Sequence, residues 1–170
     1  MDPAGAIDSA FKRCFPPVVD GGTRVLLLGS LPGAASLAHG QYYAHPQNKF
    51  WDLLGEVLGV PLRPLAYEAR LHTLLQHGFG LWDVIAEAQR DGSLDSAIRN
   101  HLGNDLQRLV ASLPALETIG FNGGKAATLG EKTLGELASR YRIVRLPSSS
   151  PAHASMSFAQ KLAMWRGLTG

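Results

Sequence analysis

Arg24–Gly29 reads RVLLLG, a short and wholly apolar run that ends at a glycine, and the loop Gly29-Ser-Leu-Pro-Gly33 follows it directly. An apolar run of this length, without polar alternation, is typical of a strand that is buried on both faces of a sheet. Such strands belong mainly to parallel sheets that are covered by helices on both sides. This stretch therefore predicts the fold class.

Three further apolar runs follow, over Phe79–Ile85, Leu116–Phe121 and Tyr141–Leu146, and helical patterns separate them. The first predicted helix begins at residue 48, and four more lie over 65–77, 105–113, 125–138 and 158–168. The last of these begins with a capping box at Ser157 and Gln160. Strands that alternate with helices imply parallel pairing. We therefore predict an α/β fold, a three-layer α/β/α sandwich around a mainly parallel four-stranded sheet. Residues 86–101 are polar and contain a predicted turn at Asp91-Gly92.

The length and composition indicate one globular domain. The chain has 170 residues, of which 45% are hydrophobic and 18% are charged. We predict a single domain over 21–170, preceded by an N-terminal extension over 1–20, and we expect a monomer. No apolar run approaches the roughly 20 residues of a membrane helix, so no membrane partner is expected. The N-terminus lacks a secretory pattern, and the single Cys14 excludes an internal disulfide, so a cytoplasmic location is expected.

The net charge of +2 is unevenly distributed. Residues 21–51 and 137–170 contain no Asp or Glu, and their basic residues are Arg24, Lys49, Arg140, Arg142, Arg145, Lys161 and Arg166. If the fold brings these two segments together, they would form a face that binds phosphates. Chance clustering is the alternative interpretation.

Two loops are candidates for a binding site. In parallel sheets, ligands bind at the carboxyl ends of the strands. The loops after the first and fourth predicted strands, GSLPG and PSSSPAHA, offer backbone N–H groups and hydroxyls to an anion. The alternative interpretation is that these two loops are only tight connections within a compact domain. The histidines show no metal-ligand spacing, so no metal and no cofactor are predicted.

Three motifs carry a family resemblance. Gly29–Gly33 (GSLPG), Gln41–Trp51 (QYYAHPQNKFW) and Leu146–His153 (LPSSSPAH) resemble the uracil-DNA glycosylase superfamily, and the resemblance covers about residues 22–168. The chain is most similar to the hypoxanthine-DNA (deoxyinosine) glycosylase family, and its first two motifs are similar to the mismatch-specific branch. The resemblance implies a monofunctional, base-flipping enzyme that removes deaminated bases, chiefly hypoxanthine, from DNA without a metal.

The resemblance also implies which residue directs the water. Most superfamily members carry Asp or Asn at the position of Leu31, whose side chain cannot form a hydrogen bond. In the hypoxanthine family Asn48 takes that part, by orienting a water rather than by acting as a strong base. Asn48 is equally suited to cap the helix that begins nearby, and the two roles compete for one side-chain oxygen.

The base pocket is predicted to contain Ser30, Leu31, Tyr43 and Asp83. Tyr43 would stack on the extruded base, with a core aromatic as the alternative, whereas Tyr42 is predicted to belong to the core. Asp83 could accept a hydrogen bond from N1–H of hypoxanthine, which adenine lacks. Its alternative role is to brace the following turn.

The last motif is predicted to supply a donor and phosphate contacts. Leu146 stands where better-known members carry His or Asn, so His153 is the candidate donor to the departing base. Asn122 is predicted to be a turn residue. The predicted DNA contacts are His45, Ser148, Ser149, Ser150 and Lys161, with loop bracing as the alternative for His45 and turn contacts for the serines. Pro151 and Ala152 lie in the segment where relatives insert an apolar wedge.

Three alternative functions remain open. The first is a glycosylase of the same fold that acts on uracil or on mismatched pyrimidines. The second is a DNA-lesion binding module without catalysis, since Leu31 and Leu146 are both apolar. The third is a small-nucleotide hydrolase, although the sequence contains no acidic metal cluster to support it.

Overall fold

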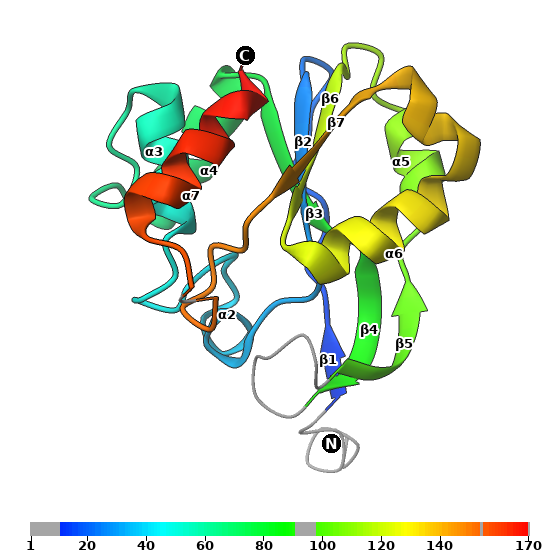
Figure 1. Ribbon diagram of the computed structural model, residues 1–170, viewed down its shortest axis with the longest axis horizontal. Helices are drawn as coiled ribbons and strands as arrows, with labels where there is room; N and C mark the ends of the chain where they lie inside the picture. Colours follow the sequence, from blue (N-terminus) through cyan, green and yellow to red (C-terminus); the bar gives the residue numbers. More distant parts are fainter. Residues whose placement is uncertain (1–10, 91–97, 154, 170) are drawn as a thin grey trace.

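The computed structural model describes residues 11–90, 98–153 and 155–169, and its centre is a four-stranded sheet (Figure 1). The strand order is β3-β2-β6-β7, and every neighbouring pair is parallel. The strands are β2 (Val25–Gly29), β3 (Phe79–Asp83), β6 (Thr118–Asn122) and β7 (Arg142–Leu146). The predicted α/β fold and its four strands are confirmed.

Alternate residues of β2 point to the two faces of this sheet, and each face has its own apolar cluster. Val25 and Leu27 pack in one cluster, whereas Leu26 and Leu28 pack in the other. Helices α3 (Phe50–Leu58), α4 (Tyr67–Gln76) and α7 (Phe158–Trp165) cover the first face, and α5 (Leu106–Ala111) and α6 (Gly124–Leu134) cover the second (Figure 1). These are the three predicted layers.

The helix ends follow local signals. The predicted capping box is present, because Ser157 Oγ accepts from the Gln160 N–H and the Gln160 side chain accepts from the Ser157 N–H. The predicted helix over 125–138 divides at Gly135 into α6 and the 3-10 helix η2 (Gly135–Arg140). A further 3-10 helix, η3 (Arg166–Leu168), follows α7. A short helix that the sequence did not predict, α2 (Ala34–His39), lies inside the loop after β2.

A second, antiparallel sheet was not predicted. It has the order β1-β4-β5 and consists of β1 (Phe11–Arg13), β4 (Ile85–Arg90) and β5 (Ile98–Gly103). These strands contain too few apolar residues to give a periodic signal. The predicted turn at Asp91-Gly92 lies outside the described residues.

The chain between β1 and β2 is bonded to the rest of the molecule. The Cys14 N–H donates to the Ala86 carbonyl, and Val18 exchanges two backbone hydrogen bonds with Leu81. The Trp82 indole donates to the Phe15 carbonyl at 2.9 Å. The described part of the predicted extension is therefore attached to both sheets. Among the described residues, the helices are all too short or too polar to span a bilayer.

Candidate active site

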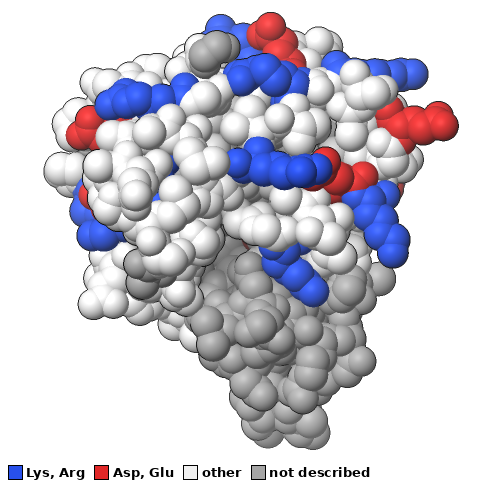
Figure 2. All heavy atoms as spheres, in the orientation of Figure 1, with Lys and Arg blue, Asp and Glu red and all other residues white. Residues whose placement is uncertain are grey.

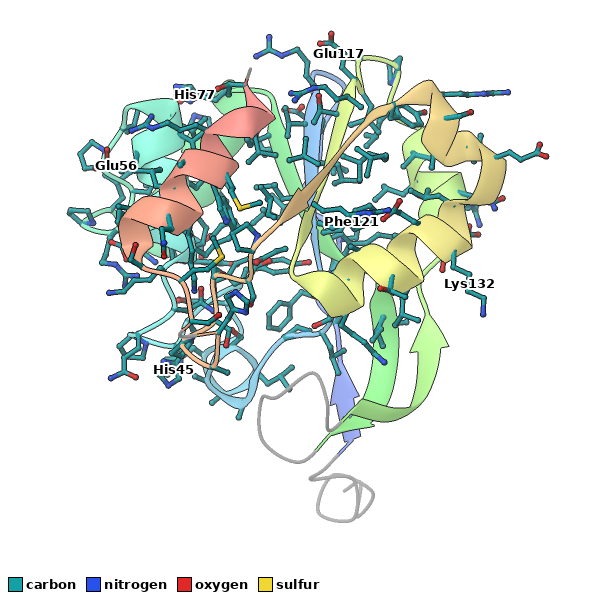
Figure 3. The ribbon with its side chains drawn as sticks, in the orientation of Figure 1. His45, Glu56, His77, Glu117, Phe121 and Lys132 are labelled. Atoms are coloured by element: carbon teal, nitrogen blue, oxygen red, sulfur yellow. The ribbon has the colours of Figure 1, made fainter. Side chains whose placement is uncertain are left out.

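A cavity of about 490 Å³ lies at the carboxyl edge of the four-stranded sheet. The register sets Gly29 beside Asp83 and Asn122 beside Leu146 at this edge. Two segments close over it, the first loop (residues 30–48, after β2) and the second loop (residues 147–153, after β7). Figure 3 shows His45 of the first loop on the side of the molecule opposite Glu117, which directly precedes β6. The cavity is thus where the predicted site was expected.

The Asp83 carboxylate and the Tyr43 hydroxyl both lie close to Gly29, which leaves room for them because it has no side chain. A Cβ atom on Gly29 would lie 2.8 Å from Asp83 Oδ1 and 2.9 Å from the Tyr43 hydroxyl oxygen. Asp83 is only 3% exposed, and its backbone carbonyl accepts from Asn104 Nδ2 at 2.7 Å. Any larger residue at position 29 would displace the carboxylate or the phenol.

Tyr43 both packs against the core and lines the cavity. Its ring stacks on Phe50 with centroids 3.8 Å apart and an angle of 11° between the planes. Its backbone has φ = 54°, in the left-handed region that non-glycine residues rarely adopt. The first loop therefore holds this ring in a conformation that is costly for the backbone.

Tyr42 occupies the core, as predicted. It is 3% exposed, and its hydroxyl donates to the Pro16 carbonyl at 3.2 Å. Burial, with a smaller contribution from the charge of Asp83, raises the pKa of Tyr42 far above its ordinary value. Its phenol is therefore neutral.

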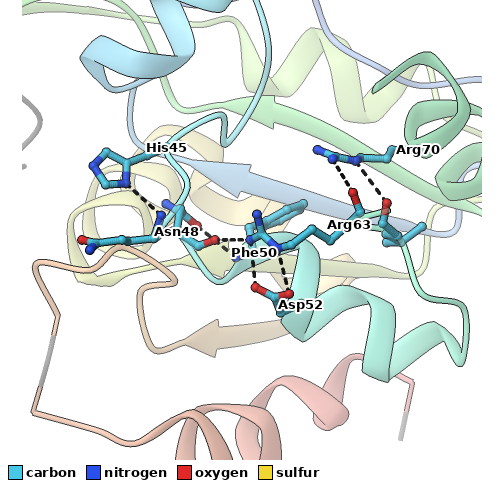
Figure 4. Close-up of polar contacts among 8 residues, drawn as sticks. His45, Asn48, Phe50, Asp52, Arg63 and Arg70 are labelled. Carbon is cyan, nitrogen blue, oxygen red and sulfur yellow. Dashed lines mark hydrogen bonds and ion pairs between the residues drawn. The ribbon is translucent and has the colours of Figure 1, made fainter. Parts of the chain in front are cut away.

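Asn48 is half-buried and lines the cavity at the end of the first loop. Its Oδ1 accepts a hydrogen bond from the Phe50 N–H at 3.0 Å (Figure 4). This bond closes a turn just before α3, but Asn48 is not the N-cap that the sequence offered as its alternative role, because Lys49 occupies that position and makes no side-chain capping bond. A carbonyl oxygen has two lone pairs, so the same atom can also accept from a water. The two roles are compatible.

His45 is exposed and braces the first loop while it lines the cavity. Its Nδ1 accepts from the Gln47 N–H at 3.1 Å, and its carbonyl accepts from the Asn48 N–H at 2.9 Å (Figure 4). With Nδ1 as the acceptor, the neutral ring carries its proton on Nε2. That nitrogen is then a donor.

The second loop is held from below by Asn122. The Asn122 side chain donates to Ser149 Oγ and accepts from the Ser149 N–H, both at 2.9 Å. Ser149 is 1% exposed, and its carbonyl accepts from the Lys49 N–H, which joins the two loops. Asn122 is therefore more than the predicted turn residue. Ser149 was predicted to contact a phosphate, but it is too deeply buried to do so.

Ser148 and Ser150 shape the second loop and remain partly exposed. Ser148 Oγ accepts from the Ser150 N–H at 3.1 Å, and Ser150 Oγ accepts from the Ala152 N–H at 3.2 Å. These are the predicted turn contacts. Each hydroxyl keeps its own proton for donation to a ligand.

His153 ends the second loop and lines the cavity. Its N–H donates to the Ser150 carbonyl at 3.0 Å. Its Nε2 is shielded from solvent and has no hydrogen-bond partner within the described residues. Such a nitrogen is suited to bond a ligand atom inside the cavity.

Ser30 and Leu31 form the wall next to β2 and are 7% and 6% exposed. Leu31 packs against Ile85, so its apolar side chain is part of a small core cluster as well as of the cavity. No cluster of three or more His, Cys, Asp or Glu side chains close enough to hold a metal ion occurs among the residues the structure describes.

Lys161 was predicted to contact DNA, but it is buried in the structure. It is 5% exposed, and burial lowers the pKa of its ammonium group. The hydrophobic periodicity of α7 placed it on a helix but could not show that its long side chain lies inward. This burial argues against the predicted contact with DNA.

The two acid-free segments do not form one positive face. Arg24 directly precedes β2 and Arg142 begins β7, both at the edge opposite the cavity, where their guanidinium groups donate to backbone carbonyls. Arg145 pairs with Glu131 at 2.6 Å, which lowers the pKa of that carboxyl group, and Arg166 pairs with Glu56 at 3.7 Å. Figure 2 shows basic and acidic side chains interspersed over the visible face.

The structure brings one unpredicted cation to the cavity. Lys125 is partly exposed in the first turn of α6, and it lines the cavity with Gly123 and Gly124. Gly123 has φ = 100°, which permits the sharp entry into α6. The sequence signal was Gly-Gly-Lys directly after the third strand, at a carboxyl end where ligands bind.

The chain is similar to known DNA glycosylases over most of its length. A family model described as the uracil DNA glycosylase superfamily matches residues 16–169. A hypoxanthine DNA glycosylase of Methanosarcina acetivorans is 42% identical over 146 residues, which are 86% of this chain and 90% of the relative. A hypoxanthine DNA glycosylase of Methanosarcina barkeri is 43% identical over 115 residues, which are 68% of this chain and 73% of the relative.

A solved structure has the same fold. It is a solution NMR structure from Methanosarcina acetivorans that is provisionally described as a uracil DNA glycosylase. It superposes with a TM-score of 0.81 at 40% sequence identity and covers 94% of this chain and 99% of that chain. The similarity therefore spans the four-stranded sheet and both loops of the cavity.

Proposed function

Because this chain belongs to the uracil DNA glycosylase superfamily, we propose that it is a monofunctional DNA glycosylase that flips out and hydrolytically removes deaminated bases, chiefly hypoxanthine. The family resemblance of the three motifs is confirmed. Both hypoxanthine DNA glycosylases described above are more than 40% identical to the chain. Its substrate is DNA that contains a deaminated base.

The observation that carries the proposal is that Asn48, Tyr43, Asp83 and His153 border one cavity. Its volume of about 490 Å³ is within the range of roughly 300–1,000 Å³ that is typical of ligand pockets. Because a glycosidic bond inside a duplex is inaccessible, the base must enter this cavity by flipping. Stacking on Tyr43 and a polar floor at Asp83 suit a purine with a hydrogen-bonding edge.

In the proposed reaction the oxygen of a water bonds to C1′ while the C1′–N9 bond breaks. The electron pair of that bond leaves with the base; the attacking water loses one proton, and the base takes up one proton, so the reaction balances. Asn48 Oδ1 accepts a hydrogen bond from the water and aims its oxygen at C1′, so positioning and the amide dipole supply the catalysis. The products are an abasic deoxyribose and free hypoxanthine.

Base selection is proposed to involve Asp83 and His153. Asp83 would accept a hydrogen bond from N1–H, which hypoxanthine has and adenine lacks. His153 would donate from a ring nitrogen to N7 and stabilise the negative charge that develops on the departing purine. Its solvent-shielded Nε2 supports this role.

The proposed phosphate contacts are Lys125, His45, Ser148 and Ser150. All four line the cavity and are at least partly exposed. Lys125 also lies in the first turn of α6, where the helix dipole favours an anion. We propose these four residues as the phosphate contacts in place of the positive face that the two acid-free segments suggested.

Uracil is the second candidate substrate, because the similar solved structure is provisionally described as a uracil DNA glycosylase. Leu31 and Leu146 count against it. Both are buried, and neither can bond a water or the oxygen of a pyrimidine. A uracil anion would therefore leave with little stabilisation.

Duplex oligonucleotides with a single hypoxanthine, uracil or xanthine test the proposal. Each is incubated with the protein and then treated with alkali, which cleaves the strand at abasic sites. We expect cleavage at hypoxanthine. Binding without cleavage of any substrate would contradict the enzyme and favour the silent binding module.

A further inference from the structure

We propose that Arg63, held by Asp52, is a positioning residue that fixes Asn48 for the attack of water. This inference rests on the proposed glycosylase function. Neither residue lines the cavity, and neither belongs to the three sequence motifs. Their connection to the site is visible only in the folded structure (Figure 4).

The guanidinium group of Arg63 joins two partners. Its Nη2 donates to the backbone carbonyl of Asn48 at 2.7 Å and to Asp52 Oδ2 at 2.8 Å. Its Nε donates to Asp52 Oδ1 at 2.8 Å, which completes a bidentate pair. A planar guanidinium can make this fork and still bond a third oxygen, whereas a lysine ammonium lacks that geometry.

These contacts complete the restraint of Asn48. Its N–H donates to the His45 carbonyl and its Oδ1 accepts from the Phe50 N–H, which leaves its carbonyl as the remaining backbone group to be bonded. Arg63 supplies that partner. The peptide before and the peptide after the Asn48 side chain are thus both fixed, which limits the positions that its Oδ1 can reach.

Arg63 is itself fixed by the chain around it. It lies between α3 and α4, and Arg70 of α4 donates to the carbonyls of Leu62, Arg63 and Leu65. The Arg70 guanidinium also lies 5.3 Å from the centroid of the Trp51 ring. Asp52 stands in the first turn of α3, directly after this tryptophan. Two helices therefore determine the position of one guanidinium group.

The exposure of the pair distinguishes positioning from stability. The side chains of Arg63 and Asp52 are 37% and 31% exposed. An ion pair this open to solvent contributes little to folding. A purely structural role predicts a small effect everywhere, whereas positioning predicts a selective effect on the chemical step.

The experiment measures single-turnover excision of hypoxanthine with protein in saturating excess, so that affinity for DNA does not enter. Arg63→Met is expected to slow excision about 10-fold, because misplacement of a reacting group by about 1 Å can cost up to about 100-fold. Asp52→Asn leaves the Arg63 bond to Asn48 possible and is expected to slow excision about 3-fold. Arg63→Lys keeps one of the contacts and is expected to be intermediate.

The decisive variant combines Arg63→Met with Asn48→Ala. If Arg63 acts through the Asn48 side chain, the double variant excises at the rate of Asn48→Ala alone. If the two losses multiply, the inference is overturned. Asp52→Asn combined with Asn48→Ala gives the same test should Arg63→Met fail to fold.

Glu56→Gln is the matched control. Glu56 lies on the same helix as Asp52 and forms a separate ion pair, with Arg166. Loss of this ion pair is expected to leave the rate of excision unchanged. If Glu56→Gln slows excision as much as Asp52→Asn does, the effect comes from a general loosening of α3, and the inference is overturned. Absence of hypoxanthine excision by the unaltered protein would instead contradict the proposed function.

Discussion

The two loops that close the cavity differ in the strain of their backbones. The first loop turns Tyr43 and Asn48 toward the cavity at the cost of an unfavourable backbone conformation. In the second loop, by contrast, no residue from 147 to 153 has a positive φ, although its three serine hydroxyls accept hydrogen bonds from the chain as His45 and Asn48 do in the first loop. Strain persists only where the surroundings enforce it, and it is concentrated at functional sites.

This difference implies a division of labour. In the proposed reaction the first loop supplies Tyr43, which stacks on the base, and Asn48, which positions the water. The second loop supplies shape, with His153 at its end as the exception. Substitutions in the first loop should therefore affect the chemical step, whereas substitutions under the second loop should affect stability first.

The largest effect is expected for Asn48→Ala. Loss of the positioned water and its dipole is expected to slow single-turnover excision by about 100-fold or more, equivalent to roughly 3 kcal/mol. Loss of the bond to the Phe50 N–H should also cost about 1 kcal/mol of stability. Asn48→Asp can make both interactions and should retain part of the activity. A less stable Asn48→Ala protein with normal excision would show that Asn48 only closes the turn before α3.

A smaller loss is expected for Tyr43→Leu. Stacking on a base is worth roughly 1–3 kcal/mol, so excision and affinity for lesion DNA together should fall about 10-fold or more. Tyr43→Phe keeps the ring on Phe50 and is the control for the hydroxyl at the cavity floor. Equal losses in both variants, measured by excision rate and by titration with lesion DNA, would remove stacking as the explanation.

Asn122→Ala tests the shaping role of the second loop. It removes both side-chain bonds to buried Ser149, so the free energy of unfolding should fall by about 2 kcal/mol. Excision should fall less than in Asn48→Ala. Thermal denaturation and single-turnover rates measure the two quantities. Unchanged stability with a loss as large as that of Asn48→Ala would assign Asn122 to the substrate instead.

The smallest effect is expected for Lys161→Met. Burial lowers the pKa of Lys161 in the folded state, so the folded protein binds this proton less tightly than the unfolded chain does. The charged group therefore destabilises the fold at neutral pH. Methionine should raise stability by about 1 kcal/mol, and the gain should shrink as the pH rises through the lowered pKa. A weaker salt dependence of DNA binding in this variant would restore Lys161 as a phosphate contact.

The sequence predicted the parallel sheet well because its signals are local. Runs such as RVLLLG in β2 must be apolar, since both of their faces are buried. The antiparallel sheet has no such signal, because β4 reads IAEAQR and its pairing with β1 joins segments that are far apart in the sequence. Pairing of this kind is not encoded in a short window of sequence.

The candidate site was predicted by residue but not by orientation. The motifs identified Asn48, Tyr43 and His153, and Asp83 was predicted from the second apolar run; the fold brings all four to one cavity. Nothing in a row of three serines distinguishes buried Ser149 from its neighbours, because the distinction depends on Asn122 across the sheet. The prediction of one positive face from the acid-free segments was wrong for a related reason. Residues before and after a strand lie at opposite edges of the sheet.

The rates of hypoxanthine and uracil excision, measured in the same duplex under single-turnover conditions, test the central claim most directly. We expect hypoxanthine to leave faster, because a purine can stack more area on Tyr43 and can bond His153 at N7 in the cavity. The buried side chains of Leu31 and Leu146 cannot form hydrogen bonds to uracil. Undamaged adenine should be spared, and Asp83→Asn should weaken hypoxanthine excision. Equal or faster release of uracil by the unaltered protein would contradict the purine assignment and favour the uracil glycosylase of the same fold.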